Sequence, residues 1–248
     1  MRMAGKVAFV TGAGGGIGSA VCRHFLAQGA RVTATDIHPD AARAAIANGS
    51  PGQAIALGVD AGDSDQVRTA IARTVAEFGT LTTLCTVAGG SSNADGPVTD
   101  APEDEFWRVI RLDLFGTFIA CKHAIPHLVA AGGGSVITMT SMTALMGTTG
   151  RDCYTAAKGG VAALTRSMAA GYGPRGVRVN AIAPGITLTP RVAANLAAQA
   201  GVQELAARHL LGLVRPDDVA QLAVYLASDE SGTITGQVLP IDSGVTIH

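Results

Sequence analysis

A tyrosine and a lysine four residues apart, Tyr154 and Lys158, form the pattern in the sequence that points most directly to chemistry. On a helix this spacing places the phenol and the ammonium on the same face. A free tyrosine, with a pKa near ~10, is a poor base at neutral pH, and a fixed cation nearby favours the phenolate. Ser141 lies 13 residues earlier and could offer a second hydroxyl to the same substrate oxygen. Each residue alone could have an ordinary structural role, but together they indicate acid–base chemistry at a hydroxyl or carbonyl group.

A glycine-rich segment follows the first apolar run of the chain and opens directly into a helical pattern. Glycine lets the backbone turn sharply and approach a pyrophosphate closely, and the start of the helix supplies unpaired N–H donors. An ordinary flexible turn is the alternative, which the position between a strand and a helix disfavours. We therefore expect a dinucleotide to bind at Gly12, Gly14, Gly15, Gly16, Ile17 and Gly18.

Asp36 ends the second expected strand, 18 residues after Gly18. A carboxylate at this position can accept hydrogen bonds from both hydroxyls of an adenosine ribose, and it would repel a 2′-phosphate. Ile37 follows, where an arginine or lysine would be expected for NADP. A turn aspartate before His38 is the alternative interpretation. The sequence therefore favours NAD over NADP as the cofactor.

The elements that must position these residues alternate along the chain. Apolar runs predict strands at 6–11, 31–35, 53–59, 81–87, 135–140, 177–183 and 237–241. Helical patterns cover 17–28, 40–47, 64–78, 102–130, 152–171 and 217–227, with Ser64 as an expected N-cap and a possible break near Gly116. Near-continuous apolar strands separated by helices predict an α/β fold of the Rossmann type. We expect a doubly wound parallel sheet of about seven strands between two helical layers, in one domain spanning 1–248.

Composition narrows the classes of protein that the chain could belong to. The formal net charge is −1, from 18 basic and 19 acidic residues, so no basic excess suggests nucleic acid or an anionic membrane as a partner. No signal peptide or transmembrane helix is apparent, and the four cysteines lack metal-binding spacing. His123 and His127 flank Pro126 without a third ligand, so no metal is expected. We expect a cytoplasmic protein with reduced thiols.

Taken together, the motifs resemble those of the short-chain dehydrogenase/reductase family, in its compact single-domain branch. The resemblance covers essentially the whole chain in the family's order. It rests on TGxxxGxG at 11–18, Asp36, Asp60, Ser141, Tyr154, Lys158, the segment 180–185 and the segment 234–244. The combination is specific, although each motif alone is not.

The resemblance implies hydride transfer between NAD(H) and a small secondary alcohol or ketone, in a homo-oligomer for which a tetramer is favoured over a dimer. Tyr154 would be the general acid and base, Ser141 would orient the substrate oxygen, and Lys158 would favour the phenolate and bind the nicotinamide ribose. Further cofactor contacts are implied for Asp60 and Ala61 at the adenine, Ala88 and Gly89 at the adenosine ribose, and Pro184, Gly185, Thr187 and Thr189 around the nicotinamide.

Two departures from the family pattern leave other functions open. Thr86 and Val87 stand where the family usually has two asparagines, and Asp113 stands where it usually has the asparagine of a proton relay. We predict that Asp113 replaces that asparagine in catalysis; the alternative is a weakened or altered relay. An NAD-binding regulator of low activity is therefore a second hypothesis, and a dehydratase or dehalogenase on the same fold is a third.

Substrate specificity is expected from the segments 90–97, 142–153 and 186–213. Met142, Leu145, Met146 and Cys153 suggest a partly apolar pocket. The alanine-rich stretch 191–210 could be a mobile substrate lid, within 187–213, or a fixed surface helix. Arg151, Arg191 and Arg208 are isolated in the sequence, and we expect them to be solvated rather than to bind an anionic substrate.

Overall fold

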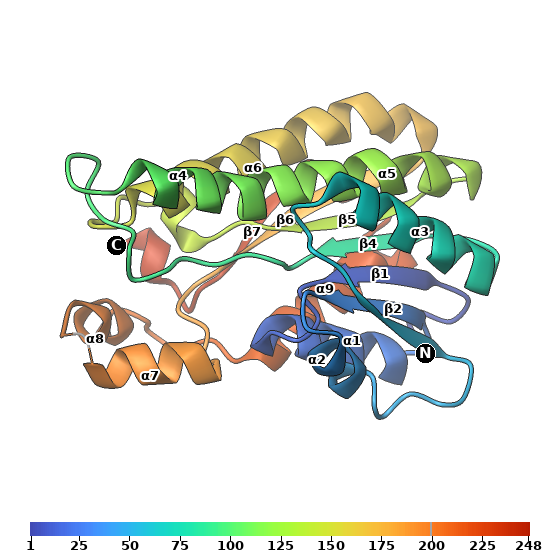
Figure 1. Cartoon of the computed structure of the whole chain (residues 1–248), viewed down its shortest axis with the longest axis horizontal. Helices are drawn as coiled ribbons and strands as arrows, with labels where there is room; N and C mark the ends of the chain where they lie inside the picture. Colours follow the sequence, from blue (N-terminus) through green and yellow to red (C-terminus); the bar gives the residue numbers. More distant parts are fainter. Residues whose placement is uncertain (199) are drawn as a thin grey trace.

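A seven-stranded parallel sheet forms the centre of the molecule in a computed structural model that describes residues 1–198 and 200–248 (Figure 1). The strand order is β3-β2-β1-β4-β5-β6-β7, so the winding reverses between β1 and β4. This confirms the predicted doubly wound sheet. The strands are β1 (Val7–Thr11), β2 (Arg31–Asp36), β3 (Ala54–Gly58), β4 (Thr83–Thr86), β5 (Gly134–Met139), β6 (Val177–Pro184) and β7 (Val238–Ile241).

Helices cover both faces of this sheet, as Figure 1 shows. One face carries α1 (Gly16–Ala27), α2 (Pro39–Ala45) and α9 (Pro216–Ala227); the other carries α3 (Ser64–Phe78), α4 (Glu103–Val109), α5 (Gly116–Ala130) and α6 (Asp152–Tyr172). Short 3-10 turns are η2 (Met142–Ala144), η3 (Gly173–Arg175), η4 (Asp229–Ser231) and η5 (Val245–Ile247). None of the helices in the described part of the chain has the length and hydropathy needed to cross a membrane.

Strand β1 illustrates why these residues form a buried sheet. Its side chains alternate, as the pleat of a strand requires. Ala8 and Val10 pack into the apolar cluster under α1 and α9, whereas Val7 and Phe9 pack into the cluster under α3 and α5. All four are fully buried, which accounts for the unbroken apolar run that predicted this strand.

The N-cap of α3 differs from the prediction. Asp63, not Ser64, is the cap: its side chain accepts hydrogen bonds from the N–H groups of Asp65 and Gln66. A carboxylate that accepts two such bonds satisfies two of the free donors at the helix start. The hydroxyl of Ser64 instead lies 2.9 Å from Nε2 of His123 on α5. Ser64 is therefore the first helical residue and joins two neighbouring helices.

The long helical stretch predicted at 102–130 contains a change of winding rather than a simple break. Between α4 and α5 lies a π-helical segment, η1 (Ile110–Phe115), and α5 begins at Gly116. A side chain at Gly116 would be crowded, since an added Cβ would lie 3.0 Å from the carbonyl oxygen of Ala61. Such π-segments are rare and occur often at functional sites because they redirect side chains. Here the segment carries Asp113, which is completely buried.

The alanine-rich stretch that follows β6 forms two helices, α7 (Pro190–Ala198) and α8 (Ala200–Ala207). Figure 1 shows them beside each other and outside the three layers. The ring of His209 connects the end of α8 to the loop that leaves β6. Its Nε2 accepts the N–H of Ile186, and its Nδ1 lies 3.1 Å from the carbonyl oxygen of Leu205. The two helices thus stand beside the loop that leaves β6.

Candidate active site

A cavity of about 660 Å³ lies at the carboxyl ends of the central strands. Ser141 and the segment 139–143 reach it from the end of β5, and Tyr154 and Lys158 reach it from the first two turns of α6. Residues of α7 and α8 close the other side. The structure therefore brings the three predicted acid–base residues together on one cavity, at the edge where ligands bind in sheets of this type.

Lys158 and Asp113 form a buried ion pair behind this cavity. Nζ of Lys158 lies 2.8 Å from Oδ1 of Asp113, and the two side chains are 4% and 0% exposed. Nζ also donates a hydrogen bond of 2.9 Å to the carbonyl oxygen of Met139, at the end of β5. Burial, the largest single effect, lowers the pKa of the Lys158 ammonium, but the charge of Asp113, the charge of Tyr154 and the hydrogen bond to Asp113 together raise that pKa above its ordinary value. Lys158 is therefore a fixed cation.

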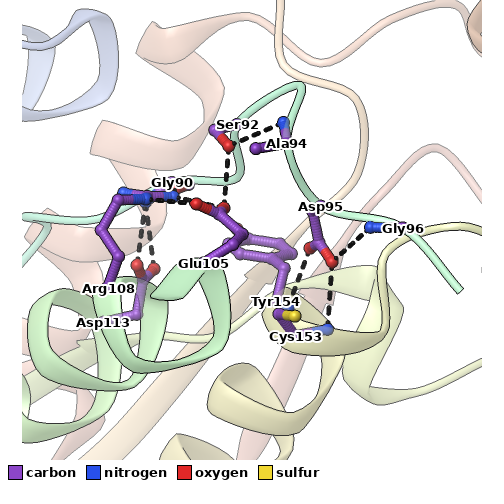
Figure 2. A network of polar contacts seen from close by, with 10 residues as sticks. All are labelled: Gly90, Ser92, Ala94, Asp95, Gly96, Glu105, Arg108, Asp113, Cys153 and Tyr154. Atoms are coloured by element: carbon purple, nitrogen blue, oxygen red, sulfur yellow. Dashed lines mark hydrogen bonds and ion pairs between the residues drawn. The ribbon is translucent and has the colours of Figure 1, made fainter. Parts of the chain in front are cut away.

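Asp113 also anchors the loop that follows β4. The N–H of Gly90 donates to both carboxylate oxygens, at 3.0 Å and 3.2 Å (Figure 2). The backbone approaches so closely that a Cβ on Gly89 would lie 2.3 Å from Oδ1 of Asp113, and φ of Gly89 is +144°. Only glycine fits this position without displacement. The carboxylate thus connects the loop to Lys158.

The hydroxyl of Ser141 is oriented by its own turn. Its Oγ accepts the N–H of Thr143 at 3.2 Å, as the cap of η2. Because a hydroxyl has one donor and two acceptor positions, the O–H hydrogen remains available to donate. Thr140 next to it donates a 2.7 Å hydrogen bond to the carbonyl oxygen of Lys158, which fixes the end of β5 against α6.

Tyr154 lies in the first turn of α6, with its ring centroid 5.5 Å from Nζ of Lys158. The start of α6 is capped from a distant part of the chain, as Figure 2 shows. The carboxylate of Asp95 accepts the N–H groups of Cys153 at 3.1 Å and Tyr154 at 3.0 Å, and it also accepts that of Gly96. Burial raises the pKa of the Cys153 thiol, which favours the uncharged thiol over the thiolate.

A second carboxylate, Glu105, stabilises the same loop from α4. It is buried, lies 2.7 Å from Nε of Arg108, and accepts a 2.8 Å hydrogen bond from the hydroxyl of Ser92. The hydrogen bonds from Arg108 hold the pKa of the Glu105 carboxyl below its ordinary value. Asp95 could not be found from the sequence because the N–H groups it accepts lie 58 and 59 residues away. Glu105 forms an i,i+3 pair with Arg108, but this common helix pattern does not indicate the contact with Ser92, 13 residues away.

The glycine-rich turn after β1 packs tightly against neighbouring backbone. Gly12 has φ of +65°, and a Cβ there would lie 2.6 Å from the backbone of Ala88; a Cβ on Gly18 would lie 2.1 Å from the carbonyl oxygen of Gly12. Gly15 is the N-cap of α1 and offers no side chain to its free N–H groups. The turn therefore leaves helix donors available to an anion.

Asp36 lies against this turn at the end of β2. Its Oδ2 accepts the N–H of Gly14 and its Oδ1 accepts that of His38, each at 3.0 Å. Each carboxylate oxygen keeps a further acceptor position, so two ribose hydroxyls could still donate to it. Asp60 follows β3 and forms a 2.9 Å ion pair with Arg111 of η1.

The predicted cofactor residues divide into two groups by position. Those that line the cavity are Ile17, Gly89, Tyr154, Lys158, Pro184, Gly185, Thr187 and Thr189. Those outside its lining are Gly12, Gly14, Gly15, Gly16, Gly18, Asp36, Asp60, Ala61 and Ala88. The two groups join where a Cβ on Gly16 would lie 2.7 Å from the side chain of Thr189. They therefore lie along the carboxyl edge of the sheet, from the end of β3 to the cavity.

The departures at Thr86 and Val87 are accommodated through Thr11 of β1. The Thr11 hydroxyl oxygen accepts the N–H groups of Val87 at 3.1 Å and Ala88 at 3.2 Å. The hydroxyl of Thr86 is buried and has no hydrogen-bond partner among the described residues. A threonine on the neighbouring strand thus stabilises the turn after β4.

The structure corrects the expectation that Arg151, Arg191 and Arg208 are isolated. All three line the same cavity as Ser141 and Tyr154. They come from the start of α6, the start of α7 and the end of α8. The fold therefore brings together three arginines that are 40 and 17 residues apart in the sequence.

Comparison with known proteins gives matches over nearly the whole chain. The family model described as enoyl-(acyl carrier protein) reductase matches residues 12–246. Cis-4-hydroxycyclohexanecarboxylate dehydrogenase of Sinomonas cyclohexanicum is 39% identical over 243 residues, which are 97% of this chain and 96% of that protein. The 3-oxoacyl-(acyl-carrier-protein) reductase of Thermotoga maritima is 33% identical and is covered over its full length, as is this chain.

Among solved structures, a 7α-hydroxysteroid dehydrogenase in complex with NADH and 7-oxo glycochenodeoxycholic acid superposes with a TM-score of 0.90. It is 30% identical to this chain, and the match covers 98% of this chain and 95% of that protein. The relatives thus share the architecture but act on different molecules.

Proposed function

The chain belongs to the short-chain dehydrogenase/reductase family, and from this premise we propose that it transfers a hydride between NAD(H) and a secondary alcohol or the corresponding ketone. The observation that carries the proposal is the placement of Ser141, Tyr154 and Lys158 on one cavity. The dehydrogenase names of its relatives support an oxidoreductase.

The acid–base steps follow from the positions of the three side chains. Bound nicotinamide would supply the hydride acceptor or donor. Ser141, whose Oγ accepts the N–H of Thr143, donates its hydroxyl hydrogen to the substrate oxygen. Tyr154 takes the proton of an alcohol at its phenolic oxygen during oxidation and returns it during reduction. Lys158, kept charged beside Asp113, favours the phenolate that takes up this proton.

We propose NAD rather than NADP as the cofactor because the end of β2 carries the carboxylate of Asp36. The free acceptor positions of Asp36 suit two ribose hydroxyls, and its charge would repel a 2′-phosphate. Ile37 beside it is 63% exposed and offers no cation. The uncapped start of α1 would receive the pyrophosphate, and the loop after β6 with Thr187 and Thr189 would face the nicotinamide.

We further propose that the segment 187–213 acts as a lid over the substrate. Its two helices stand outside the three layers and line the cavity at Val192, Val202 and Leu205. Lids of this kind close over a substrate and exclude water from the reaction. The four cysteines are buried and free, which supports a reducing compartment such as the cytoplasm.

Self-association is the remaining part of the proposal. Phe106, Trp107, Phe115 and Phe118 expose large aromatic surface along α4, η1 and α5. A row of exposed aromatic residues is unusual for a monomer and typical of an interface. We propose that this surface packs against a second copy of the chain, in a tetramer.

The first test is cofactor binding followed by turnover. Titration with NADH and NADPH, monitored by nicotinamide fluorescence, should show tighter binding of NADH. Turnover is then measured with NAD and secondary alcohols, including cis-4-hydroxycyclohexanecarboxylate and D-threitol. Tyr154→Phe should lower kcat about 10²-fold or more, while NADH binding is kept. Tyr172→Phe, on the same helix but outside the cavity lining, should keep full activity. Tight NADH binding without turnover of any alcohol or ketone would favour the regulator hypothesis.

A further inference from the structure

We propose that Arg151 and Arg191 form an anion subsite that binds a carboxylate of the substrate, so that the chain acts on hydroxy acids and oxo acids. This inference rests on the proposed alcohol–ketone function and specifies its substrate class. It concerns the end of the substrate that does not react.

The two guanidinium groups converge on neighbouring residues of the loop after β4. Nη1 of Arg151 donates a 2.8 Å hydrogen bond to the hydroxyl of Ser91. The guanidinium of Arg191 lies over Gly90, where an added Cβ would be 2.5 Å from Nη2. Since Gly90 and Ser91 are consecutive residues, Arg151 from α6 and Arg191 from α7 contact adjacent positions of the same loop.

The charge on these two groups is not compensated within the described part of the chain. Neither arginine forms an ion pair there, and Arg151 is half-buried and Arg191 exposed. The cavity's buried cation, Lys158, is paired with Asp113. The guanidinium of Arg208 donates to the main-chain oxygen of His248. Among the described lining residues the acidic member is Glu204, which is exposed on α8. The cavity wall near Gly90 is therefore cationic.

A carboxylate suits this arrangement better than a neutral group. The planar guanidinium offers parallel N–H donors that match two carboxylate oxygens, and such charge-assisted bonds are stronger than neutral ones. Arg151, the N-cap of α6, and Tyr154, in its first turn, both line the cavity. We propose that a small ring or short chain places its carboxylate at Arg151 and its alcohol carbon beside Tyr154.

The pyrophosphate of the cofactor is the competing anion for Arg191, because Gly90 directly follows the predicted cofactor residues Ala88 and Gly89. Arg151 is the N-cap of α6 and contacts Ser91, one residue further along the chain, so it is the stronger test of a substrate role. The two sources of negative charge can be separated by measuring cofactor and substrate binding independently.

The binding experiment uses calorimetry on the purified chain saturated with NADH. Cyclohexanecarboxylate should bind at least tenfold more tightly than cyclohexanecarboxamide, and Arg151→Gln should abolish that preference. Arg166→Gln removes the same charge from the same helix outside the cavity lining and should leave it intact. Equal binding of acid and amide by the unmodified chain would overturn the proposal, whether or not turnover is observed.

The kinetic experiment compares 4-hydroxycyclohexanecarboxylate with its carboxamide, using NAD. Arg151→Gln should raise KM for the acid about tenfold or more, with kcat and the KM for the amide little changed. For Arg191→Gln, the acid preference should fall while the dissociation constant of NADH stays within twofold. If instead NADH binding weakens tenfold and the preference persists, Arg191 serves the cofactor and its place in the subsite is refuted. Absence of turnover with both compounds would count against the alcohol–ketone function, while the calorimetry would still decide the anion subsite.

Discussion

The ammonium of Lys158 and the carboxylate of Asp113 lie 2.8 Å apart in the interior, one on α6 and the other on the π-helical segment between α4 and α5. Such a pair costs desolvation energy on both sides, and its survival in a core needs good geometry and further hydrogen bonds. Both are present here, through the carbonyl of Met139 and the N–H of Gly90. The position for which the family pattern implies a neutral asparagine thus holds a charge that is directly bonded to Lys158, the proposed catalytic lysine.

Replacement of that charge should change the pH dependence of the reaction. In Asp113→Asn the carboxylate that keeps Lys158 charged is gone, so burial lowers the pKa of the ammonium and the Tyr154 phenolate loses cationic stabilisation. We expect the rising limb of the pH–rate profile for alcohol oxidation to move to higher pH, by about one unit, which corresponds to about 1.4 kcal/mol. Profiles of kcat/KM measure this; Asp65→Asn, on the surface of α3, is the matched control. An unchanged profile would exclude a role for the carboxylate in proton transfer.

Removal of the lysine alone should destabilise the fold strongly. Lys158→Met leaves the fully buried Asp113 without its cation, and loss of one partner from a buried pair costs about 3–5 kcal/mol. The double variant Asp113→Asn with Lys158→Met should regain much of that loss because no unpaired charge remains. Denaturant unfolding of the four chains gives the coupling free energy directly. Additive effects would show that the pair does not act as a unit.

The same pair predicts how stability depends on pH. Since the folded chain raises the pKa of Lys158 above its ordinary value of 10.5, protonation stabilises the fold fully below about pH 10.5. This contribution falls as pH rises through the higher, folded value. Between pH 9 and 12 the melting temperature of the unmodified chain should therefore fall more steeply than that of the double variant. If the melting temperatures of the two chains fell in parallel with pH, Lys158 would not account for the loss of stability at alkaline pH.

The sheet could be predicted from the sequence because its strands are buried on both faces, as the alternating packing of Val7, Ala8, Phe9 and Val10 shows. Ser141, Tyr154 and Lys158 could be placed at one edge because each follows or starts an element whose position in a parallel sheet is fixed. Their identity came from the family pattern. The π-helical winding around Asp113 could not be predicted, since it depends on packing against α6 and the loop after β4.

The loop 90–98 shows where sequence reasoning fails. Asp95 caps a helix that begins 57 residues later, and Arg151 reaches Ser91 across the same gap. These contacts are decided by the tertiary fold rather than by local propensity. That Arg151, Arg191 and Arg208 line one cavity could not be predicted either, because nothing in their separate neighbourhoods indicates it; Arg191 is nevertheless exposed, as expected.

Cofactor choice should respond to a change at the end of β2. Asp36→Ala with Ile37→Arg removes the charge that would repel a 2′-phosphate and adds a cation at an exposed position. We expect the ratio of kcat/KM for NADP to that for NAD to rise about tenfold or more, a change of about 1.4 kcal/mol. Ile37→Arg alone is the control for the added cation. A ratio that stays constant in the double variant would mean that Asp36 does not contact the ribose.

Self-association should depend on the aromatic surface of α4 and α5. Trp107→Glu with Phe118→Lys places charges where 63% and 46% of the native side chains are exposed, so the monomer should fold normally. A buried interface would not tolerate them. Light scattering after size exclusion should show a smaller assembly than the unmodified chain. The double variant Leu210→Glu with Leu211→Lys, at two other exposed positions, tests whether any change of surface charge has this effect. If neither double variant changed the mass of the assembly, the proposed interface would be refuted.

Asp95 should act as a positioning residue for Tyr154. Its carboxylate accepts two N–H groups from the first turn of α6, and loss of a cap costs about 0.5–2 kcal/mol. Asp95→Ala should lower the free energy of unfolding by that amount and also reduce kcat, because the tyrosine hydroxyl shifts relative to Ser141. Asp95→Asn keeps an acceptor oxygen and should restore most of kcat. Asp63→Ala, the equivalent cap on α3 away from the cavity, should lose similar stability without loss of kcat. If both alanine variants reduced kcat equally, the effect would be one of stability, and the proposed positioning role would fail.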